Sequence, residues 1–423
     1  MDHLINDQKV VDLTKKYSTP FYLYDGDKLK EKYYNFKKGL HKNIEIYYSL
    51  KANNNISIAS LYKSLGSGIE IASKGELYIA LKAGFNPQKI IFSGPGKTFE
   101  ELNYAIQEGI KLIIVESIEE IKLLDSIAIQ HNKIVSVAIR INPDEKTAAQ
   151  VKMTGIPSQF GIDKEILNSA LSEINLCNNL VFSGIHVYLG TQNLDEKDII
   201  KNIKYTLKVA LDIYFEHGLI CKVIDFGGGF GIPYFQGQNI LKMDEIKLVL
   251  NSLVSNNKVF ADTKFILESG RYLLAESGMY ITKVTYRKIS KGKTFLIVDG
   301  GLHHCVAPTF QGRLIRDNFP VKLISSPKNS VKETVTIVGP LCTPEDCLAK
   351  NIKLPKAIPG DHICILNVGA YGLSYSPVHF LGHTTPYELL KIDNNFVKIR
   401  DKGNHDDILN NQILINLKGE NYE

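Results

Sequence analysis

The chain has 423 residues, of which 44% are hydrophobic and 22% charged, and its formal net charge is +5. That length exceeds the roughly 250–300 residues at which a single hydrophobic core stops growing, so two domains are expected. Charges of both signs are interspersed and no apolar run nears the roughly 18 residues of a membrane span, so we expect no nucleic-acid partner and no membrane insertion. Scattered cysteines and an N-terminus without an apolar segment predict a cytoplasmic protein without a metal site.

Short β-branched segments alternate with longer helical patterns between residues 44 and 268. One of these helices is expected to start at Ser117 with an S-x-x-E capping box that ends at Glu120. Strands that alternate with helices form parallel βα units, and eight such units predict a (β/α)8 barrel. The predicted strands are residues 44–50, 68–72, 90–94, 112–116, 135–141, 182–188, 222–227 and 265–268.

The pattern changes after Arg271, where strand-like segments follow one another without helices of similar length. These segments are residues 279–287, 294–300, 335–339 and 362–367. They predict a mostly antiparallel second domain, and the strand-like segment Phe21–Asp25 is expected to join it. The expected organisation is therefore a barrel over residues 26–278 and a β-domain built from residues 1–25 and 279–423.

Polar and glycine residues follow the predicted barrel strands, where βα loops carry the active sites of barrel enzymes. Gly227–Gly231 follows the seventh strand, and backbone N–H groups without side chains can approach a phosphate closely. Arg271, just past the eighth strand, can add a forked donor to the same group. A plain glycine turn is the alternative, but the position after strand seven favours a phosphate site.

Two charged residues at strand ends suggest covalent chemistry with an aldehyde cofactor. Lys51 follows the first strand, and a desolvated lysine there would have a lowered pKa and attack an aldehyde. Glu268 ends the eighth strand, and a buried carboxylate needs a partner such as a protonated pyridine nitrogen. A solvated surface lysine and a structural ion pair of Glu268 are the plainer alternatives.

Eight sequence motifs, in order along the chain, resemble those of one enzyme family. They are YYSLKANNN, IEIASKGEL, SQFGID, GIHVYLGTQ, DFGGGFGIPY, ESGRY, VGPLCTPEDCLAK and NVGAYG. These motifs are similar to those of the fold-type III pyridoxal-phosphate (PLP) decarboxylases, which include diaminopimelate, ornithine and arginine decarboxylases. The resemblance implies PLP as cofactor and a barrel of the alanine-racemase type with a C-terminal β-domain. It also implies a head-to-tail homodimer with active sites shared across the subunit interface.

The resemblance assigns roles to individual residues. Lys51 resembles the lysine that carries PLP as a Schiff base, and Glu268 resembles the acidic partner of its pyridine nitrogen. Cys342 resembles a catalytic cysteine that the neighbouring subunit contributes, where it protonates the carbanion left by carbon dioxide. The other cofactor contacts that the resemblance implies are Glu70, Arg140, Tyr188, Thr191, Gly228, Gly229, Arg271 and Tyr371.

Three positions depart from the common pattern of the family. Tyr188 stands where most members stack a histidine on the cofactor ring, so a π-face is kept but any proton function of an imidazole is lost. Thr343 and Ala307 stand where diaminopimelate decarboxylases usually have a glutamate and an arginine that bind the far end of the substrate. Leaving that charged end unpaired is costly, which argues against free diaminopimelate.

The segments GIHVYLGTQ, GLHHCVAPTFQGRLIRDNFP, VGPLCTPEDCLAK and SPVHFLGH are similar to a smaller branch of the family. This branch decarboxylates a glutamyl group thioesterified to an acyl carrier protein in the biosynthesis of the antibiotic butirosin. A tethered substrate has no charged far end, which agrees with Thr343 and Ala307. Carrier proteins are typically acidic, so Arg313, Arg316 and Lys322 are candidate docking cations. The sequence thus predicts decarboxylation of a carrier-tethered, glutamate-like α-amino acid.

Three other functions stay open. A decarboxylase of free amino acids, with diaminopimelate first, differs only in substrate. Alanine racemases have an arginine where this chain has Glu268. A non-catalytic PLP-binding protein of the bare-barrel type would lack a second domain, and Cys342 and Tyr371 lie beyond the predicted barrel.

Overall fold

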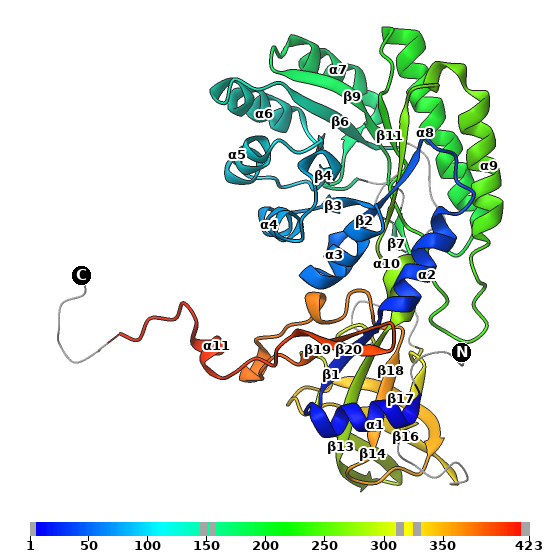
Figure 1. Cartoon of the computed structure of the whole chain (residues 1–423), viewed down its shortest axis with the longest axis vertical. Coiled ribbons are helices and arrows are strands. Elements are labelled where there is room, and N and C mark those ends of the chain that lie inside the picture. Colours follow the sequence, from blue (N-terminus) through cyan, green and yellow to red (C-terminus); the bar gives the residue numbers. More distant parts are fainter. Residues whose placement is uncertain are drawn as a thin grey trace. The chain divides into compact units, whose positions relative to one another are not determined.

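A computed structural model describes residues 6–143, 151–152, 157–188, 190–309, 317–324 and 331–415. The chain divides into two compact units, which we describe separately (Figure 1). The barrel unit comprises Asp25–Gly278 and Asn367–Ser374, and the β unit comprises Met1–Tyr24, Met279–Leu366 and Tyr375–Glu423. The short segment Asn367–Ser374 groups with the barrel although it follows the strands of the β unit in sequence.

Eight parallel strands close into a ring in the barrel unit, as predicted from the alternating pattern. Their order is β5-β4-β3-β2-β12-β11-β9-β6, and the pairing of β5 with β6 closes the barrel. The strands are β2 (Ile44–Ser49), β3 (Gly68–Ile71), β4 (Ile90–Phe92), β5 (Leu112–Val115), β6 (Val135–Asn142), β9 (Leu180–His186), β11 (Val223–Asp225) and β12 (Lys264–Ser269). The short strands β7 (Val151–Lys152), β8 (Ile162–Asp163) and β10 (Gly190–Thr191) add β7–β10 and β6–β8 pairs.

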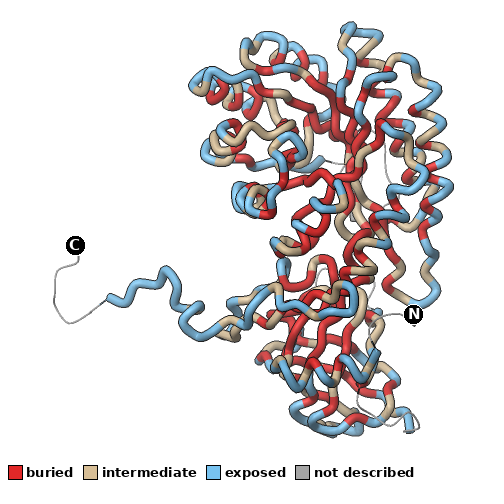
Figure 2. Tube along the Cα trace, in the orientation of Figure 1, coloured by how far each residue is buried: buried red, intermediate tan, exposed pale blue. Residues whose placement is uncertain are grey.

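Helices surround the ring of strands and cover it with an apolar face, so the strands are buried while the outer helix faces are exposed (Figure 2). The helices are α2 (Gly26–Lys37), α3 (Ile56–Ser64), α4 (Lys74–Lys82), α5 (Phe99–Glu108), α6 (Ile118–Gln130), α7 (Leu167–Leu176), α8 (Glu196–His217), α9 (Met243–Asn256) and α10 (Arg271–Leu274). Single 3-10 turns occur at η1 (Leu50–Ala52), η2 (Pro87–Lys89), η3 (Lys164–Ile166), η4 (Lys258–Phe260) and η5 (Ala275–Ser277). Tyr47, Ile114 and Ile266 belong to the packed interior of the barrel.

The start of α6 differs from the predicted capping box. Ser117 caps the helix by accepting a hydrogen bond from the backbone N–H of Glu120. The carboxylate of Glu120 accepts instead from the backbone N–H of Glu116 and pairs with the buried ammonium of Lys97. Glu120 therefore serves a buried polar network, because Lys97 attracts its carboxylate inward.

The β unit contains a mostly antiparallel sheet, as predicted, and the strand Phe21–Asp25 joins it. Its order is β17-β16-β14-β13-β1-β19-β20, with β18 paired to β13 and β15, and only β14 and β16 are parallel among the pairings described. The strands are β1 (Phe21–Asp25), β13 (Gly278–Ser290), β14 (Lys293–Val298), β15 (Val321–Ile324), β16 (Lys332–Val338), β17 (Cys347–Pro355), β18 (His362–Leu366), β19 (Tyr387–Ile392) and β20 (Asn395–Arg400). The remaining elements are α1 (Asp7–Lys16), α11 (Asp406–Leu409), η6 (Leu373–Tyr375) and η7 (Phe380–Gly382).

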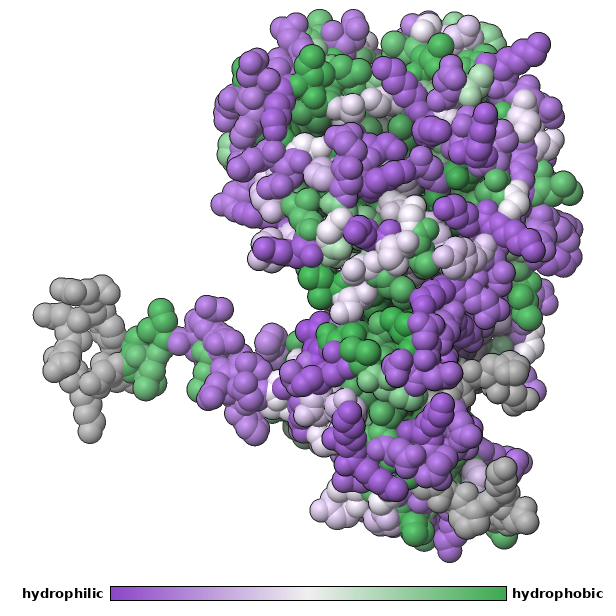
Figure 3. Space-filling model, in the orientation of Figure 1, coloured by the Kyte–Doolittle hydropathy of each residue, from purple (hydrophilic) through white to green (hydrophobic). Residues whose placement is uncertain are grey.

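The surface is largely hydrophilic on the face drawn in Figure 3. An exception is the run Ile413–Ile415 after α11, whose three side chains are all exposed. Among the helices that the structure describes, none is both long and apolar enough to cross a membrane.

Candidate active site

A polar pocket opens at the carboxyl ends of the barrel strands, where the loops after β2, β9, β11 and β12 converge. Its walls belong to the barrel unit alone. They are formed by Ser49, Lys51, Tyr188, Thr191, Gly228, Gly229, Phe230, Glu268, Ser269, Gly270, Arg271 and Tyr371. Eight of the residues predicted to contact the cofactor therefore line one pocket, although they are spread over 320 positions of the sequence from Lys51 to Tyr371.

Lys51 lies on the turn η1, directly after β2, and its ammonium group pairs with Glu70 on β3. Its Nζ atom donates to both carboxylate oxygens of Glu70, at 2.8 and 2.9 Å. Protein atoms surround the lysine closely, yet 42% of its side-chain surface remains open to the pocket. Burial disfavours its charge, but the carboxylates of Glu70 and Glu268 outweigh burial and raise the pKa of Lys51. The predicted lowering of the lysine pKa is therefore wrong for this structure, because Glu70 supplies a buried counter-charge.

One side of the pocket is suited to an anion. A side chain at Gly228 or Gly229 would clash with backbone oxygens of Glu268 or Gly190, at 2.8 and 2.3 Å, so only glycine leaves the backbone accessible here. Within the described residues, the N–H groups of Gly228 and Gly229 donate no hydrogen bond. Bare N–H groups beside an arginine favour binding of a phosphate.

Arg271 and Tyr371 complete the anion-binding side. The Arg271 guanidinium carbon lies 4.6 Å from the centre of the Tyr371 ring, and its Nη1 donates to the hydroxyl of Tyr234 at 3.0 Å. Nε of Arg271 is buried and has no hydrogen-bond partner among the described residues. Tyr371 has a left-handed backbone with φ of 54°, and its N–H donates to the carbonyl of Ala52. An uncommon backbone conformation of this kind is typical of functional sites.

The pocket also holds a buried acid. Glu268 is 3% exposed, and its Oε1 has no hydrogen-bond partner among the described residues. Burial and the nearby carboxylates of Asp225 and Glu70 raise the pKa of Glu268 well above its usual range. A buried, protonated carboxyl group is suited to a basic nitrogen, because transfer of the proton gives a hydrogen-bonded ion pair.

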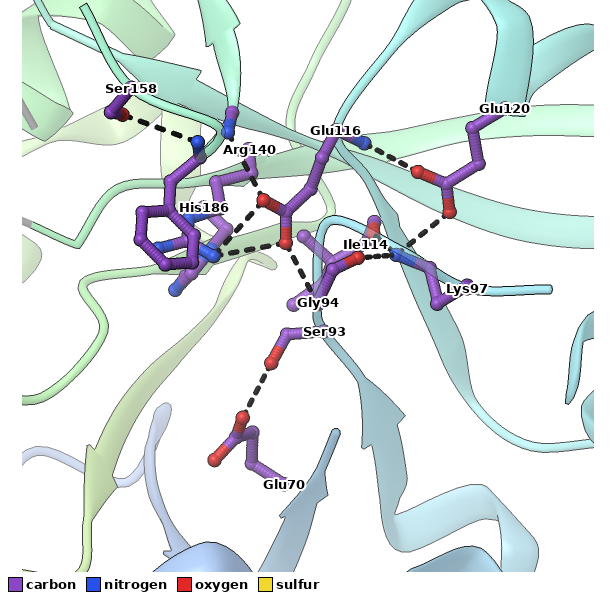
Figure 4. A network of polar contacts seen from close by, with 12 residues as sticks. Glu70, Ser93, Gly94, Lys97, Ile114, Glu116, Glu120, Arg140, Ser158 and His186 are labelled. Atoms are coloured by element: carbon purple, nitrogen blue, oxygen red, sulfur yellow. Dashed lines mark hydrogen bonds and ion pairs between the residues drawn. The ribbon is translucent and has the colours of Figure 1, made fainter. Parts of the chain in front are cut away.

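A polar network anchors Arg140 on β6 beside the pocket (Figure 4). Its Nη1 donates to both carboxylate oxygens of Glu116, at 2.9 and 3.1 Å. Glu116 also accepts from the backbone N–H groups of Gly94 and Gly161. The guanidinium carbon of Arg140 then lies 5.9 Å from the centre of the Tyr188 ring, so the network positions one wall of the pocket.

Several residues of the site were not predicted. Ser49, Phe230, Ser269 and Gly270 line the pocket, and each is adjacent or nearly adjacent to a residue that was predicted. His186 on β9 and Asp225 on β11 lie buried beside Glu268. Both lie inside motifs that the sequence analysis quoted, GIHVYLGTQ and DFGGGFGIPY, but they were given no role there. The alternation of side chains along each strand was the signal that could have placed them inside the barrel.

The residues predicted to touch the substrate lie on the β unit, except Arg313, which falls outside the described residues. Cys342 is exposed, Thr343 accepts a hydrogen bond from the N–H of Glu345, and Ala307 is half-buried. Buried Asp346 accepts from the backbone N–H groups of Leu302 and Leu341, at 2.7 and 2.8 Å. That carboxylate fixes the loop of Ala307 and the loop of Cys342 relative to each other.

The pocket at the mouth of the (β/α)8 barrel combines an amine, an anion-binding side and a buried acid. These groups fit PLP, and a pocket of this kind is typical of PLP enzymes. Residues 26–275 match the family model described as "Pyridoxal-dependent decarboxylase, pyridoxal binding domain". The chain belongs to this family of pyridoxal-dependent decarboxylases.

Individual relatives extend the match to the whole chain. The chain is 48% identical over 415 residues, 97% of each chain, to the L-glutamyl-[BtrI acyl-carrier protein] decarboxylase of Niallia circulans. It is 35% identical to a diaminopimelate decarboxylase of Helicobacter pylori, over 86% of this chain and 88% of the relative. The structure of the H. pylori diaminopimelate decarboxylase with L-lysine is similar, with a TM-score of 0.86 and 32% identity over 95% of this chain and 98% of that chain.

A buried histidine of the β unit makes its stability sensitive to acid. His304 Nε2 contacts the carbonyl of Thr384 at 2.8 Å, so Nε2 carries the proton, and Nδ1 faces the hydroxyl of Tyr280 at 3.2 Å. Burial, reinforced by the nearby His383, lowers the pKa of His304 to about 4. The unfolded chain, in which the histidine pKa is about 6.5, therefore binds one more proton than the folded chain between these values.

We expect His304→Gln to reduce the acid sensitivity of the fold. Each pH unit below about 6.5 costs the wild type about 1.4 kcal/mol through this group, up to about 3 kcal/mol near pH 4. Urea denaturation at a series of pH values between 4 and 7 measures the effect. Exposed His405→Gln controls for loss of a histidine, and equal slopes for His304→Gln and wild type would contradict the assignment.

Proposed function

We propose that this decarboxylase acts on a glutamyl group tethered to an acyl carrier protein. The observation that carries the proposal is the 48% identity, over 97% of both chains, to a decarboxylase whose substrate is L-glutamyl acyl-carrier protein. Thr343 and Ala307 support it, because neither carries the charge needed to bind an ammonium–carboxylate pair at the far end of diaminopimelate. The hydroxyl of Thr343 is moreover engaged within its own turn.

Bound PLP supplies an electron sink for the negative charge that develops at the α-carbon when carbon dioxide leaves. Lys51 provides the amine for its covalent attachment, and Glu70 can take up the proton that the amine must lose. Glu268 holds a proton at the pyridine nitrogen. Gly228, Gly229 and Arg271 bind the phosphate, and Tyr188 offers a ring face for stacking. All the residues that are assigned to cofactor binding and activation here belong to the barrel unit.

Protonation of the α-carbon is assigned to Cys342 of a second copy of the chain. The assignment rests on the resemblance to the family and on the position of Cys342 as an exposed thiol on the β unit. Asp346, four residues further on, fixes the backbone of its loop through the N–H of Leu341. A head-to-tail homodimer would then contain two active sites, each built from both chains.

The role of Lys51 predicts that Lys51→Ala abolishes the covalent link to the cofactor and reduces turnover by orders of magnitude. Borohydride reduction followed by peptide mapping measures the link directly. Exposed Lys82→Ala is the matched control and should retain it. Full borohydride-stable PLP in the Lys51→Ala protein would overturn the assignment.

The shared site predicts complementation between two inactive variants. Lys51→Ala and Cys342→Ala homodimers should each be inactive, whereas an equal mixture after subunit exchange should regain up to about a quarter of wild-type activity. The reason is that half of the dimers are then heterodimers, and each heterodimer has one site with both residues intact. An active monomer in sedimentation, or no recovery after proven exchange, would contradict the dimer proposal.

The choice between tethered and free substrate rests on a direct comparison. Diaminopimelate decarboxylases of H. pylori match this chain over most of its length, so free meso-diaminopimelate is the second candidate. We expect the catalytic efficiency on glutamyl carrier protein to exceed that on meso-diaminopimelate by orders of magnitude. Efficient turnover of meso-diaminopimelate without turnover of the thioester would overturn the substrate proposal and leave the cofactor site unaffected.

If an acidic carrier protein docks on basic residues, reversing their charge should slow the reaction of the carrier-bound substrate. Arg313→Glu with Arg316→Glu should slow the carrier-bound reaction about tenfold at low salt, and added salt should shrink the effect. Lys322 is a weaker candidate, because its ammonium already pairs with Asp7. The double variant Lys204→Glu with Lys208→Glu, on the outer face of α8, changes the net charge equally and serves as control.

A further inference from the structure

Three buried titratable side chains meet on the floor of the barrel pocket. His186 ends β9, Asp225 ends β11 and Glu268 lies near the end of β12, and they are 1%, 0% and 3% exposed. One nitrogen of His186 and one oxygen of each carboxyl group all lie within 4.8 Å of one another. The register of the sheet brings them together, since His186 and Asp225 are direct partners on neighbouring strands.

The hydrogen-bonding capacity of this cluster is largely unused. Both ring nitrogens of His186, Oδ2 of Asp225 and Oε1 of Glu268 are buried and lack a hydrogen-bond partner among the described residues. The His186 Nε2 atom lies 3.5 Å from Glu268 Oε1, at the outer limit of a hydrogen bond. Buried polar atoms are almost always satisfied in folded proteins, so such a concentration of unsatisfied atoms indicates a functional arrangement.

We propose that His186 and Asp225 are positioning residues that donate hydrogen bonds to Glu268 and fix it as the proton donor to the ring nitrogen of PLP. The inference rests on the proposed cofactor role of Glu268 and deepens it. Glu268 releases its proton to the nitrogen and becomes a carboxylate, and the N–H of His186 and the O–H of Asp225 stabilise the negative charge. One proton moves in this exchange, and no other group is consumed.

The charges around the cluster favour these protonation states. Burial, followed by the positive charges of Arg140, Lys51 and Lys97, lowers the pKa of His186 well below its usual value, so the imidazole is neutral. Burial, followed by the repulsion of Glu70, raises the pKa of Asp225, so this carboxyl group retains its proton more readily. Asp225 still accepts the N–H of Gly227 through Oδ1, which leaves Oδ2 for the cluster.

The charged network of Figure 4 holds the cluster in this state. Arg140 and His186 are direct partners on β6 and β9, so the guanidinium group of Arg140 lies next to the imidazole. Glu116 neutralises part of that charge and fixes its position, at 2.9 Å from Nη1. A fixed cation beside the ring keeps the imidazole from taking up a second proton, so it remains a donor on one nitrogen only.

A pair of amide variants tests the geometry. His186→Gln places an N–H near the position of Nε2 and should preserve the hydrogen bond to Glu268, whereas the shorter His186→Asn cannot reach it. A hydrogen bond to a charged group contributes about 1.5–3 kcal/mol, so His186→Asn should shift the ratio of protonated to unprotonated pyridine nitrogen about ten- to hundredfold. The 15N NMR shift of enzyme-bound PLP labelled at the pyridine nitrogen, followed against pH, measures this ratio without turnover.

Asp225→Asn tests the protonation state assigned to Asp225. An amide reproduces a protonated carboxyl group, with one acceptor for Gly227 and one donor for Glu268, so this variant should keep the pyridine nitrogen protonated as in the wild type. Asp225→Leu should lose part of that protonation. Thr206→Val, which removes a buried hydroxyl on α8, controls for loss of a buried polar group.

The outcomes separate this inference from the proposed function. Failure of the wild type to bind PLP would overturn the cofactor role itself. Variants His186→Asn and His186→Gln with equal 15N titrations would overturn only the positioning role, whereas a wild type that binds PLP with an unprotonated nitrogen would also overturn the role of Glu268. Stoichiometric zinc in the purified holoenzyme, measured by mass spectrometry and lost in His186→Asn, would show that the cluster holds a metal ion and would equally overturn it.

Discussion

The burial of three carboxyl groups in one barrel mouth is the constraint on which the rest of the site depends. Glu70, Asp225 and Glu268 are each at most 3% exposed. Three carboxyl groups that are buried close together cannot all be ionised, because each negative charge lacks solvation and repels the others. Lys51, which is open to the pocket, and buried Arg140 are two nearby cations, and each is already paired. Lys51 pairs with Glu70, and Arg140 pairs with Glu116 outside the trio. The pKa values of Asp225 and Glu268 are therefore raised, so the pocket floor retains protons more readily than free carboxyl groups would.

The same constraint orients a ligand. The acid floor includes Glu268 on β12, while the glycines after β11 and the guanidinium group of Arg271 attract an anion. A molecule with a basic nitrogen at one end and a phosphate at another would place its nitrogen at the acid and its phosphate at the glycines and Arg271. Lys51 lines the same pocket and offers an amine there. Under the proposed function, the orientation of the cofactor would follow from the positions of these charged and protonated groups, before any contact with a substrate is considered.

The sequence allowed the barrel, the second sheet and most of the pocket lining to be predicted, because strand ends and glycine runs are local signals. It did not allow the partners of those residues to be predicted. The pKa of Lys51 was expected to fall, and it rises because β3 places Glu70 against it. His186 and Asp225 were missed because each stands in an apolar strand, and only the register between strands shows that they meet. Pairing across strands is a long-range property that local pattern does not encode.

In the proposed function, substrate choice and cofactor chemistry depend on different parts of the chain. The residues assigned to PLP belong to the barrel unit, whereas Thr343 and Ala307 belong to the β unit, on loops that a single buried carboxylate, Asp346, ties together. If Thr343 and Ala307 contact the substrate as proposed, the choice between a free diamino acid and a tethered glutamyl group depends on the two loops held by Asp346 and not on the barrel pocket.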